Sequence, residues 1–309
     1  MFPDDKITEI FFMCDEFSKV FDQHIASTRK LQPSEGLRKR SYHRDCRMSD
    51  SEVMTIMIAF HNSGFRCLKH FYQHVCDHMR HLFPEVVSYN RFVELQKVAV
   101  VKLVVFVKTV LMGKCTGISF IDSTPLRVCR RQRILQHKTF KGLAQLGKCS
   151  MGWFYGFKLH LICNEKGELL NFMLTRANVD DRNLDVFNRL ADNVFGKLYA
   201  DKGYISQTLF DRLFSNGLNL VTGFRSNMKN KLMPLYDKLM LRKRSVIESI
   251  NDELKNVAQL VHSRHRSVFN FCMNVLSALV AYSFFEKKPA INIDFDIEER
   301  DPTLLTLLS

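Results

Sequence analysis

The spacing of hydrophobic residues divides the chain into a helical first third and a mixed remainder. Before residue 113, apolar side chains recur at steps of three and four, which is typical of amphipathic helices. Ser49 and Glu52 form a capping-box pattern at the start of the second helix, and Pro84 ends the third. The expected helices cover residues 6–25, 50–64, 67–83 and 89–112.

After residue 113 the pattern changes to short segments rich in β-branched and aromatic residues, which indicate strands. Five strands are expected, over residues 117–128, 153–163, 169–175, 197–200 and 218–222. Helices are expected over residues 184–195, 206–215, 243–260 and 267–285. The turn at residues 164–167 makes the second and third strands a hairpin. This order predicts an α/β domain with a mixed sheet.

Three regions follow from these patterns. Residues 1–112 are expected to form a helical DNA-binding region, and residues 113–288 the α/β domain. Residues 289–309 contain five acids and one base, and are expected to form an acidic tail. The turn between residues 84 and 88 is interpreted either as part of a helix-turn-helix-like unit or as a purely structural connection.

Composition narrows the class of protein. Of the 309 residues, 46% are hydrophobic and 25% charged, which excludes an intrinsically disordered or collagen-like chain. The net charge of +13 favours a polyanionic partner such as nucleic acid. Nine cysteines without a C-x-x-C pair indicate neither a disulfide framework nor a zinc ribbon, and a reduced cytoplasmic compartment fits best. No leader peptide or membrane span is expected.

Two carboxylates occupy unusual positions for a strongly basic domain. Asp122 lies inside an apolar strand, where an unpaired charge costs several kcal/mol. Asp201 ends another apolar strand. Functional groups are often presented at the carboxyl ends of neighbouring parallel strands. Either acid alone is equally explained as a turn cap or as a partner of Lys202 or Arg127.

A third carboxylate is expected from the helix that follows a basic loop. Arg244, Glu248, Asp252 and Lys255 fall on one helical face, at about 100° per residue. Ile247, Ile250, Leu254 and Val257 form a separate stripe that is expected to face the core. A carboxylate between cations suits a metal next to a phosphate, although a solvated face with ordinary ion pairs would look the same.

Together these motifs resemble the acidic triad and signature helix of bacterial insertion-sequence DDE transposases. The matching residues are Asp122 in Asp-Ser-Thr, Asp201 in Ala-Asp-Lys-Gly-Tyr, and Glu248 between Arg244 and Lys255. The chain length, the helical N-terminal region and the spacing of 47 residues between the last two acids look most like the insertion-sequence 982 family.

The resemblance implies an RNase H-like fold with a mixed five-stranded sheet, flanking helices and a preceding helical region. It implies that Asp122, Asp201 and Glu248 bind two Mg²⁺ ions, for which Mn²⁺ can substitute, and that the enzyme cleaves and transfers DNA strands at the ends of the element. The implied partners are the terminal inverted repeats, the target DNA and a second copy of the chain in a synaptic complex. A bacterial, nucleoid-associated protein is expected.

Phosphate contacts are expected from bases near these acids. Residues 127–148 contain seven bases and no acid, and residues 225–244 contain seven bases and Asp237 alone. The expected contacts are Arg244, Lys255, Lys202, Arg127, Arg130, Arg131, Arg133, Lys141 and Lys243. Alternatively, both basic runs are ordinary solvated loops.

The strand pattern also predicts roles for side chains that follow the first basic run, residues 127–148. Lys158 and His160 share one strand face and are expected to lie just behind the metal ligands, His160 in particular; an ordinary pair on the strand surface is the alternative. Trp153, Phe154 and Tyr155 are interpreted as core residues, with base stacking as the alternative.

Two other functions remain open on the sequence. A related nuclease would cleave DNA without strand transfer. A degenerate or domesticated transposase would bind DNA without any chemistry, and would be indifferent to the change Glu248→Gln.

Overall fold

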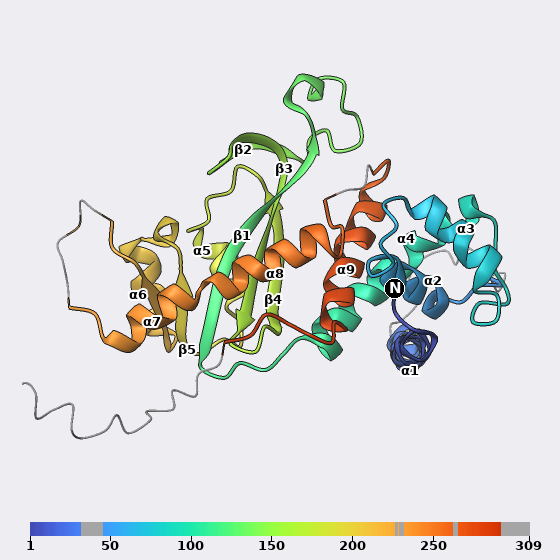
Figure 1. Ribbon diagram of the computed structural model, residues 1–309, viewed down its shortest axis with the longest axis horizontal. Coiled ribbons are helices and arrows are strands. Elements are labelled where there is room, and N and C mark those ends of the chain that lie inside the picture. Colours follow the sequence, from blue (N-terminus) through green and yellow to red (C-terminus); the bar gives the residue numbers. More distant parts are fainter. Residues whose placement is uncertain (32–45, 226–227, 229–231, 262–264, 292–309) are drawn as a thin grey trace, which may run out of the picture.

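The computed structural model describes residues 1–31, 46–225, 228, 232–261 and 265–291, and shows a group of N-terminal helices beside a sheet flanked by helices (Figure 1). The predicted acidic tail lies beyond residue 291, outside the described residues. Residues 226–227 and 229–231, in the second basic segment of the sequence, are also outside them.

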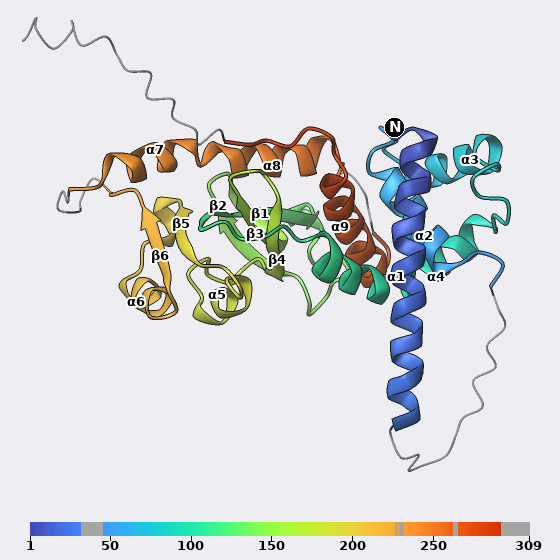
Figure 2. The ribbon, with the colours of Figure 1, turned by 90° about the horizontal axis from the view of Figure 1, so that it is seen from below.

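The N-terminal helices begin largely where the sequence predicts. They are α1 (Asp4–Leu31), α2 (Asp50–Phe60), α3 (Leu68–His78) and α4 (Tyr89–Phe106), which continues as a π-helix over Val107–Leu111. The capping box is present: the Ser49 side chain accepts from the backbone N–H of Glu52, and the Glu52 carboxylate accepts from the backbone N–H of Ser49 at 2.7 Å. Figure 2 shows α1 extending well past the other helices.

The prediction that the third helix runs to Phe83 is wrong. The helix α3 stops at His78, because the chain leaves the helical conformation at Met79. The backbone N–H groups of Leu82 and Phe83 both donate to the Met79 carbonyl oxygen. This turn buries Met79 and Phe83, so tertiary packing overrides the local helical pattern.

The described residues form one mixed sheet. Its strands are β1 (Ile118–Cys129), β2 (Gln145–Cys149), β3 (Gly152–Asn164), β4 (Leu169–Arg176), β5 (Gly196–Ala200) and β6 (Leu218–Thr222). The order is β4-β3-β1-β5-β6, in which β3 is antiparallel to β1 and β4, whereas β5 and β6 are parallel to their neighbours. This is the predicted RNase H-like arrangement of five strands.

The strand β2 was not predicted. It pairs with the beginning of β3, next to the stretch that pairs with β4. Its sequence QLGKC lacks β-branched residues, so the strand depends on its partners. Gly147 lies against the backbone of Ala177, where a Cβ atom would meet the carbonyl oxygen at 2.0 Å.

Helices cover both faces of the sheet (Figure 2). One face carries α5 (Leu184–Leu190) and α6 (Gln207–Ser215), and the other carries α7 (Leu235–Lys243) and α8 (Ser245–Asn256). The helix α5 ends five residues earlier than predicted, and the left-handed Asn193 (φ 62°) lies in the turn that follows it.

The helix α7 was predicted as part of a basic loop. It is held to β5 by the buried Asp237, which accepts from Lys197 Nζ at 2.7 Å and from the Tyr199 hydroxyl at 2.8 Å. The acid that interrupts the second basic run is therefore a structural residue.

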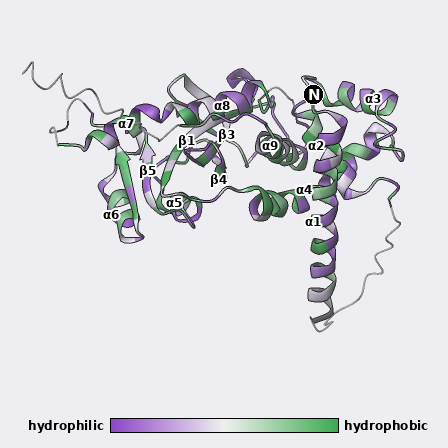
Figure 3. Cartoon of the chain, turned by 60° about the horizontal axis from the view of Figure 1, so that its bottom comes forward, coloured by the Kyte–Doolittle hydropathy of each residue, from purple (hydrophilic) through white to green (hydrophobic). Residues whose placement is uncertain are grey.

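The helix α9 (Val268–Ser283) connects the two parts of the molecule. It is strongly hydrophobic (Figure 3) and packs on α2 and α4, while its Tyr282 hydroxyl donates to the Gly167 carbonyl oxygen at 2.7 Å. One hydrophobic core therefore continues from the N-terminal helices into β1 and β3. The boundary at residue 112 stays a prediction. Among the described residues, no helix is both long enough and apolar enough to cross a membrane.

Candidate active site

Asp122 lies on β1, the strand in the middle of the sheet. Its backbone is opposite Leu161 of β3, and its Oδ2 accepts a hydrogen bond from Asn251 Nδ2 of α8 at 2.9 Å. Burial, with a smaller contribution from the negative charges of Glu248 and Asp201, raises the pKa of Asp122 to about 6, although the positive charge of Arg244 opposes the shift. Because these charges act on Asp122, all four groups share one electrostatic environment.

Asp201 comes directly after β5, which is parallel to β1. Phe120 of β1 is in register with Tyr199 of β5, so two residues further along each strand Asp122 is level with Asp201. Neighbouring strands are about 4.8 Å apart. Asp201 Oδ1 accepts from the backbone N–H of Lys202 at 2.6 Å and caps the 3₁₀-helix Lys202–Tyr204. Asp201 directly follows β5, as predicted, but Asp122 lies inside β1, which continues to Cys129, so the two acids are level on adjacent strands without both being at a strand end.

Glu248 is supplied by the first turn of α8, which crosses β1 in Figure 1. Its side chain is 56% exposed and accepts a hydrogen bond from Arg244 Nη2 one turn earlier. The helix turns its apolar stripe inwards, but Val257 of the predicted stripe is 51% exposed, because the helix ends at Asn256; Val246 is buried instead.

The three carboxylates supply only oxygen donors, which is the chemistry that Mg²⁺ and Mn²⁺ prefer. In the part of the chain that the structure describes, no three Asp, Glu, His or Cys side chains are gathered tightly enough to hold a metal ion as they stand. Glu248 is held by Arg244, so its exposed carboxylate would have to turn away from that cation to join Asp122. The residues fit a divalent ion in kind and in location, with this one rearrangement.

Comparison with known proteins gives the family. A family model described as a transposase DDE domain matches residues 112–268, about half of the chain. The chain belongs to the DDE transposase family. One solved structure, a cryo-EM structure of a piggyBac transposase synaptic complex with hairpin DNA, is similar with a TM-score of 0.43 and 10% identity, over 91% of this chain and 72% of that one. No curated protein matches the transposase.

The predicted phosphate contacts of the transposase fall into two groups. Arg244 and Lys202 lie beside the carboxylates, and Lys255 is two turns along α8 from Glu248, about 10 Å away. Lys243 is exposed at the end of α7. Four other residues line a cavity at the far end of β1: Arg127, Arg130, Arg131 and Arg133. Lys141 is exposed on the same loop but does not line the cavity.

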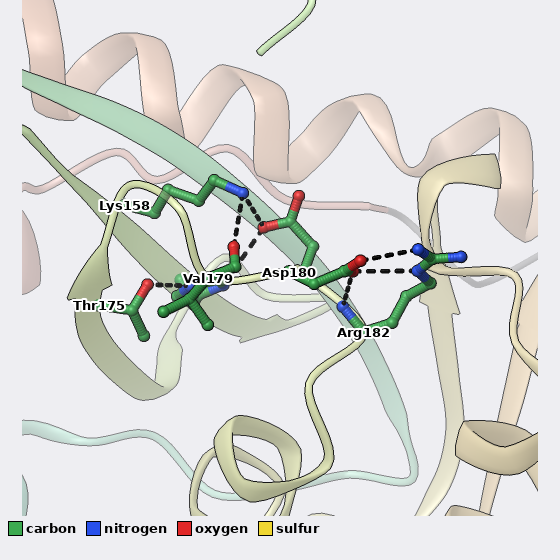
Figure 4. A network of polar contacts seen from close by, with 7 residues as sticks. Lys158, Thr175, Val179, Asp180 and Arg182 are labelled. Atoms are coloured by element: carbon green, nitrogen blue, oxygen red, sulfur yellow. Dashed lines mark hydrogen bonds and ion pairs between the residues drawn. The ribbon is translucent and has the colours of Figure 1, made fainter. Parts of the chain in front are cut away.

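Lys158 and His160 contact a carboxylate that sequence reasoning missed. Lys158 Nζ donates to Asp181 Oδ1 at 3.1 Å and to the Val179 carbonyl oxygen at 2.9 Å, as Figure 4 shows. His160 Nε2 lies 2.8 Å from Thr175 Oγ1, and its Nδ1 lies 4.0 Å from Asp181 Oδ1. Burial lowers the pKa of His160 to about 4. The two residues therefore position the segment after β4.

That segment shares its electrostatic environment with Asp122. The buried Tyr204 has a pKa raised well above its ordinary value, first by burial and then by the charges of Asp122 and Asp181. The pair Asp180 and Asp181 begins five residues after the end of the predicted strand 169–175, and two adjacent acids in the loop after a strand are the signal that could have found it. Asn251 could have been found from its spacing, one turn after Glu248 on α8.

Proposed function

We propose that this DDE transposase cleaves DNA at the ends of a mobile element and transfers the strand to target DNA, with Asp122, Asp201 and Glu248 as metal ligands. The supporting observation is the convergence of a partly buried acid in the central strand, a second acid level with it on the parallel neighbour and a third on the helix above. Burying a carboxylate is costly, and Asp122 is largely buried while two further acids act on or lie level with it, so this arrangement favours a chemical role.

The side chains around the acids have distinct tasks in this proposal. Asn251 orients the Asp122 carboxylate through its 2.9 Å hydrogen bond. Arg244 neutralises Glu248 in the free protein and, when that carboxylate turns to a metal, becomes available to a DNA phosphate. Lys202, next to Asp201, is exposed and adds a second phosphate contact. Two bound Mg²⁺ ions, or Mn²⁺, would polarise the scissile phosphate and stabilise the leaving oxygen.

The same proposal includes the type of transposase, its location and its partners. We infer a bacterial transposase of the insertion-sequence 982 type, located in the cytoplasm with the nucleoid. The helices of residues 1–112 would contact the terminal inverted repeats, and two copies would assemble on paired ends. The support is the charge and motif pattern of the sequence, to which family membership adds DNA as the substrate.

A cleavage and strand-transfer assay tests the proposal. The substrate is a duplex that carries the DNA flanking the coding sequence, with Mg²⁺ or with EDTA. The wild-type transposase is expected to cut and join only with Mg²⁺, and Glu248→Gln to bind the duplex with unchanged affinity but not to cut it. Asp252→Asn, on the same helix and exposed, is the matched control and should cut normally.

The other possible functions give different results in this assay. Cleavage without joined products would identify a nuclease. Absence of cleavage by the wild type, with binding identical in wild type and Glu248→Gln, would identify a degenerate transposase that only binds DNA.

A further inference from the structure

A large cavity lies at the C-terminal end of β1. Its volume is about 1720 Å³, above the range of roughly 300–1,000 Å³ typical of small-molecule sites. Three separate segments line it: the end of β1 with the loop that follows, the strands β2 and β3 near their turn, and the chain after α8. In Figure 1 that loop projects beyond the sheet, above α8 and α9.

Cationic side chains dominate the lining. Five arginines contribute to it: Arg127, Arg130, Arg131, Arg133 and Arg266. All five are exposed, no lining residue is acidic, and none of the five forms an ion pair within the described part of the chain. Arg266 comes from a separate segment, after α8, and no basic run in the sequence pointed to it. Guanidinium groups from two segments around one cavity suit the phosphates of a nucleic acid strand.

The cavity also presents an aromatic ring. Trp153 lines it and is 51% exposed; the next residue, Phe154, also lines it but is buried. A half-exposed indole bounded by arginines matches a base with its phosphates, since stacking on an aromatic face is tolerant of base identity. The interpretation of Trp153 as a core residue is therefore wrong.

The walls are held in place by packing. Phe140, at the end of the loop, is 2% exposed, and its ring centroid lies 5.6 Å from that of Phe157 and 5.2 Å from that of Phe271. The Tyr155 hydroxyl donates to the Phe140 carbonyl oxygen at 3.4 Å. The loop is thus fastened to β3 and α9, and the arginines need little ordering when a ligand binds.

The cavity and the carboxylates lie along one strand. Arg127 is five residues beyond Asp122 on β1, which corresponds to about 17 Å. Because side chains alternate along a strand, this odd spacing puts Asp122 and Arg127 on opposite faces of β1, so the cavity is a site separate from the carboxylates.

We propose that this cavity binds an unstacked nucleotide of the DNA, with its base against Trp153 and its flanking phosphates held by Arg266 and by the arginines at the end of β1 and in the loop that follows it. This proposal relies on the proposed function to say which DNA is bound, but the binding itself does not depend on that function. A paired base inside a duplex cannot offer its face to the indole, so the cavity selects single-stranded, bulged or frayed DNA.

Trp153 is the single tryptophan of the chain, so its fluorescence reports on this site alone. The full-length transposase in EDTA is titrated with a single-stranded oligonucleotide, a blunt duplex of the same sequence, that duplex with one bulged nucleotide, deoxyadenosine monophosphate and tripolyphosphate. Single-stranded and bulged DNA are expected to quench the fluorescence at concentrations at least about ten times lower than the blunt duplex does. Equal quenching by all three DNAs, no quenching, or quenching by the free nucleotide at the same concentration as the oligonucleotide would overturn the proposal.

Variants test the same site by fluorescence anisotropy of labelled DNA. Trp153→Ala is expected to weaken single-stranded binding by roughly 5- to 150-fold and to abolish the preference over the blunt duplex. Arg266→Ala should reduce that preference, while Lys141→Ala, which removes one charge from the same loop outside the cavity, should leave it unchanged. If Lys141→Ala and Arg266→Ala have the same effect, the cavity is not the site. These measurements need neither metal nor cleavage. If they show no binding in the cavity, the proposed role of the carboxylates is unaffected. If the cleavage assay fails, the binding result for the cavity still holds.

Discussion

The salt dependence of DNA binding tests whether the exposed arginines after β1 contact the DNA backbone. Arg130, Arg131 and Arg133 are exposed, form no ion pair within the described residues and line one cavity. Each phosphate that a base neutralises adds about 0.9 to the slope of log affinity against log salt on duplex DNA. Replacing all three by Gln should therefore reduce the slope by about 2.7, so that the affinity advantage of the wild type shrinks roughly 40-fold between about 50 and 200 mM salt.

The assay is fluorescence anisotropy with labelled duplex DNA at five or more salt concentrations. The matched control replaces Lys114, Lys166 and Arg189 by Gln. These residues are equally exposed and without an ion pair in the described chain, but lie towards the start of β1, the β3–β4 turn and α5. The control should lose little slope. Equal slopes for the wild type and the arginine variant would refute the reasoning and show that these charges serve only solubility.

Three further predictions concern individual side chains. Burial lowers the pKa of His61 to about 4, so the unfolded chain takes up a proton that the folded chain does not, and the free energy of unfolding should fall by about 3 kcal/mol from pH 6.5 to pH 4. His61→Asn, which keeps a donor for the Ala258 carbonyl oxygen, should flatten this fall in urea unfolding, and an identical fall would contradict the assignment. Asp237→Ala leaves the Tyr199 hydroxyl without its acceptor and should cost about 2–3 kcal/mol, seen as a lowered Tm; an unchanged Tm would argue against α7 being anchored there. Asn251→Ala should reduce cleavage about 10- to 100-fold without lowering Tm, because the carboxylate it orients loses its donor, and full activity would exclude a positioning role.

Sequence patterns that span only a few residues predicted the fold well. The capping box of Ser49 and Glu52 places the start of α2 correctly, since both hydrogen bonds are local. The apolar segments before Asp122 and Asp201 are likewise recognisable, because a carboxylate in such a context is conspicuous. Family membership then agrees with the transposase reading of the sequence.

Features that depend on distant contacts were missed. The helix α7 exists where the sequence shows a basic loop, because Asp237 reaches a strand 40 residues away. Asp181, which lies after β4, can be recognised as part of the site only from its contact with Lys158 of β3. The cavity is assembled from three segments, so neither Arg266 nor the outward position of Trp153 could be inferred from the neighbouring sequence.

Binding of Mn²⁺ to the DNA-bound transposase, followed by electron paramagnetic resonance of the free ion, tests the central claim most directly. The wild type is predicted to remove Mn²⁺ from solution, and Asp122→Asn, Asp201→Asn and Glu248→Gln each to lose that binding. Asp252→Asn, an exposed acid on the same helix, should bind as the wild type does. Mn²⁺ binding that survives in all three variants would contradict the assignment of these carboxylates as the metal site.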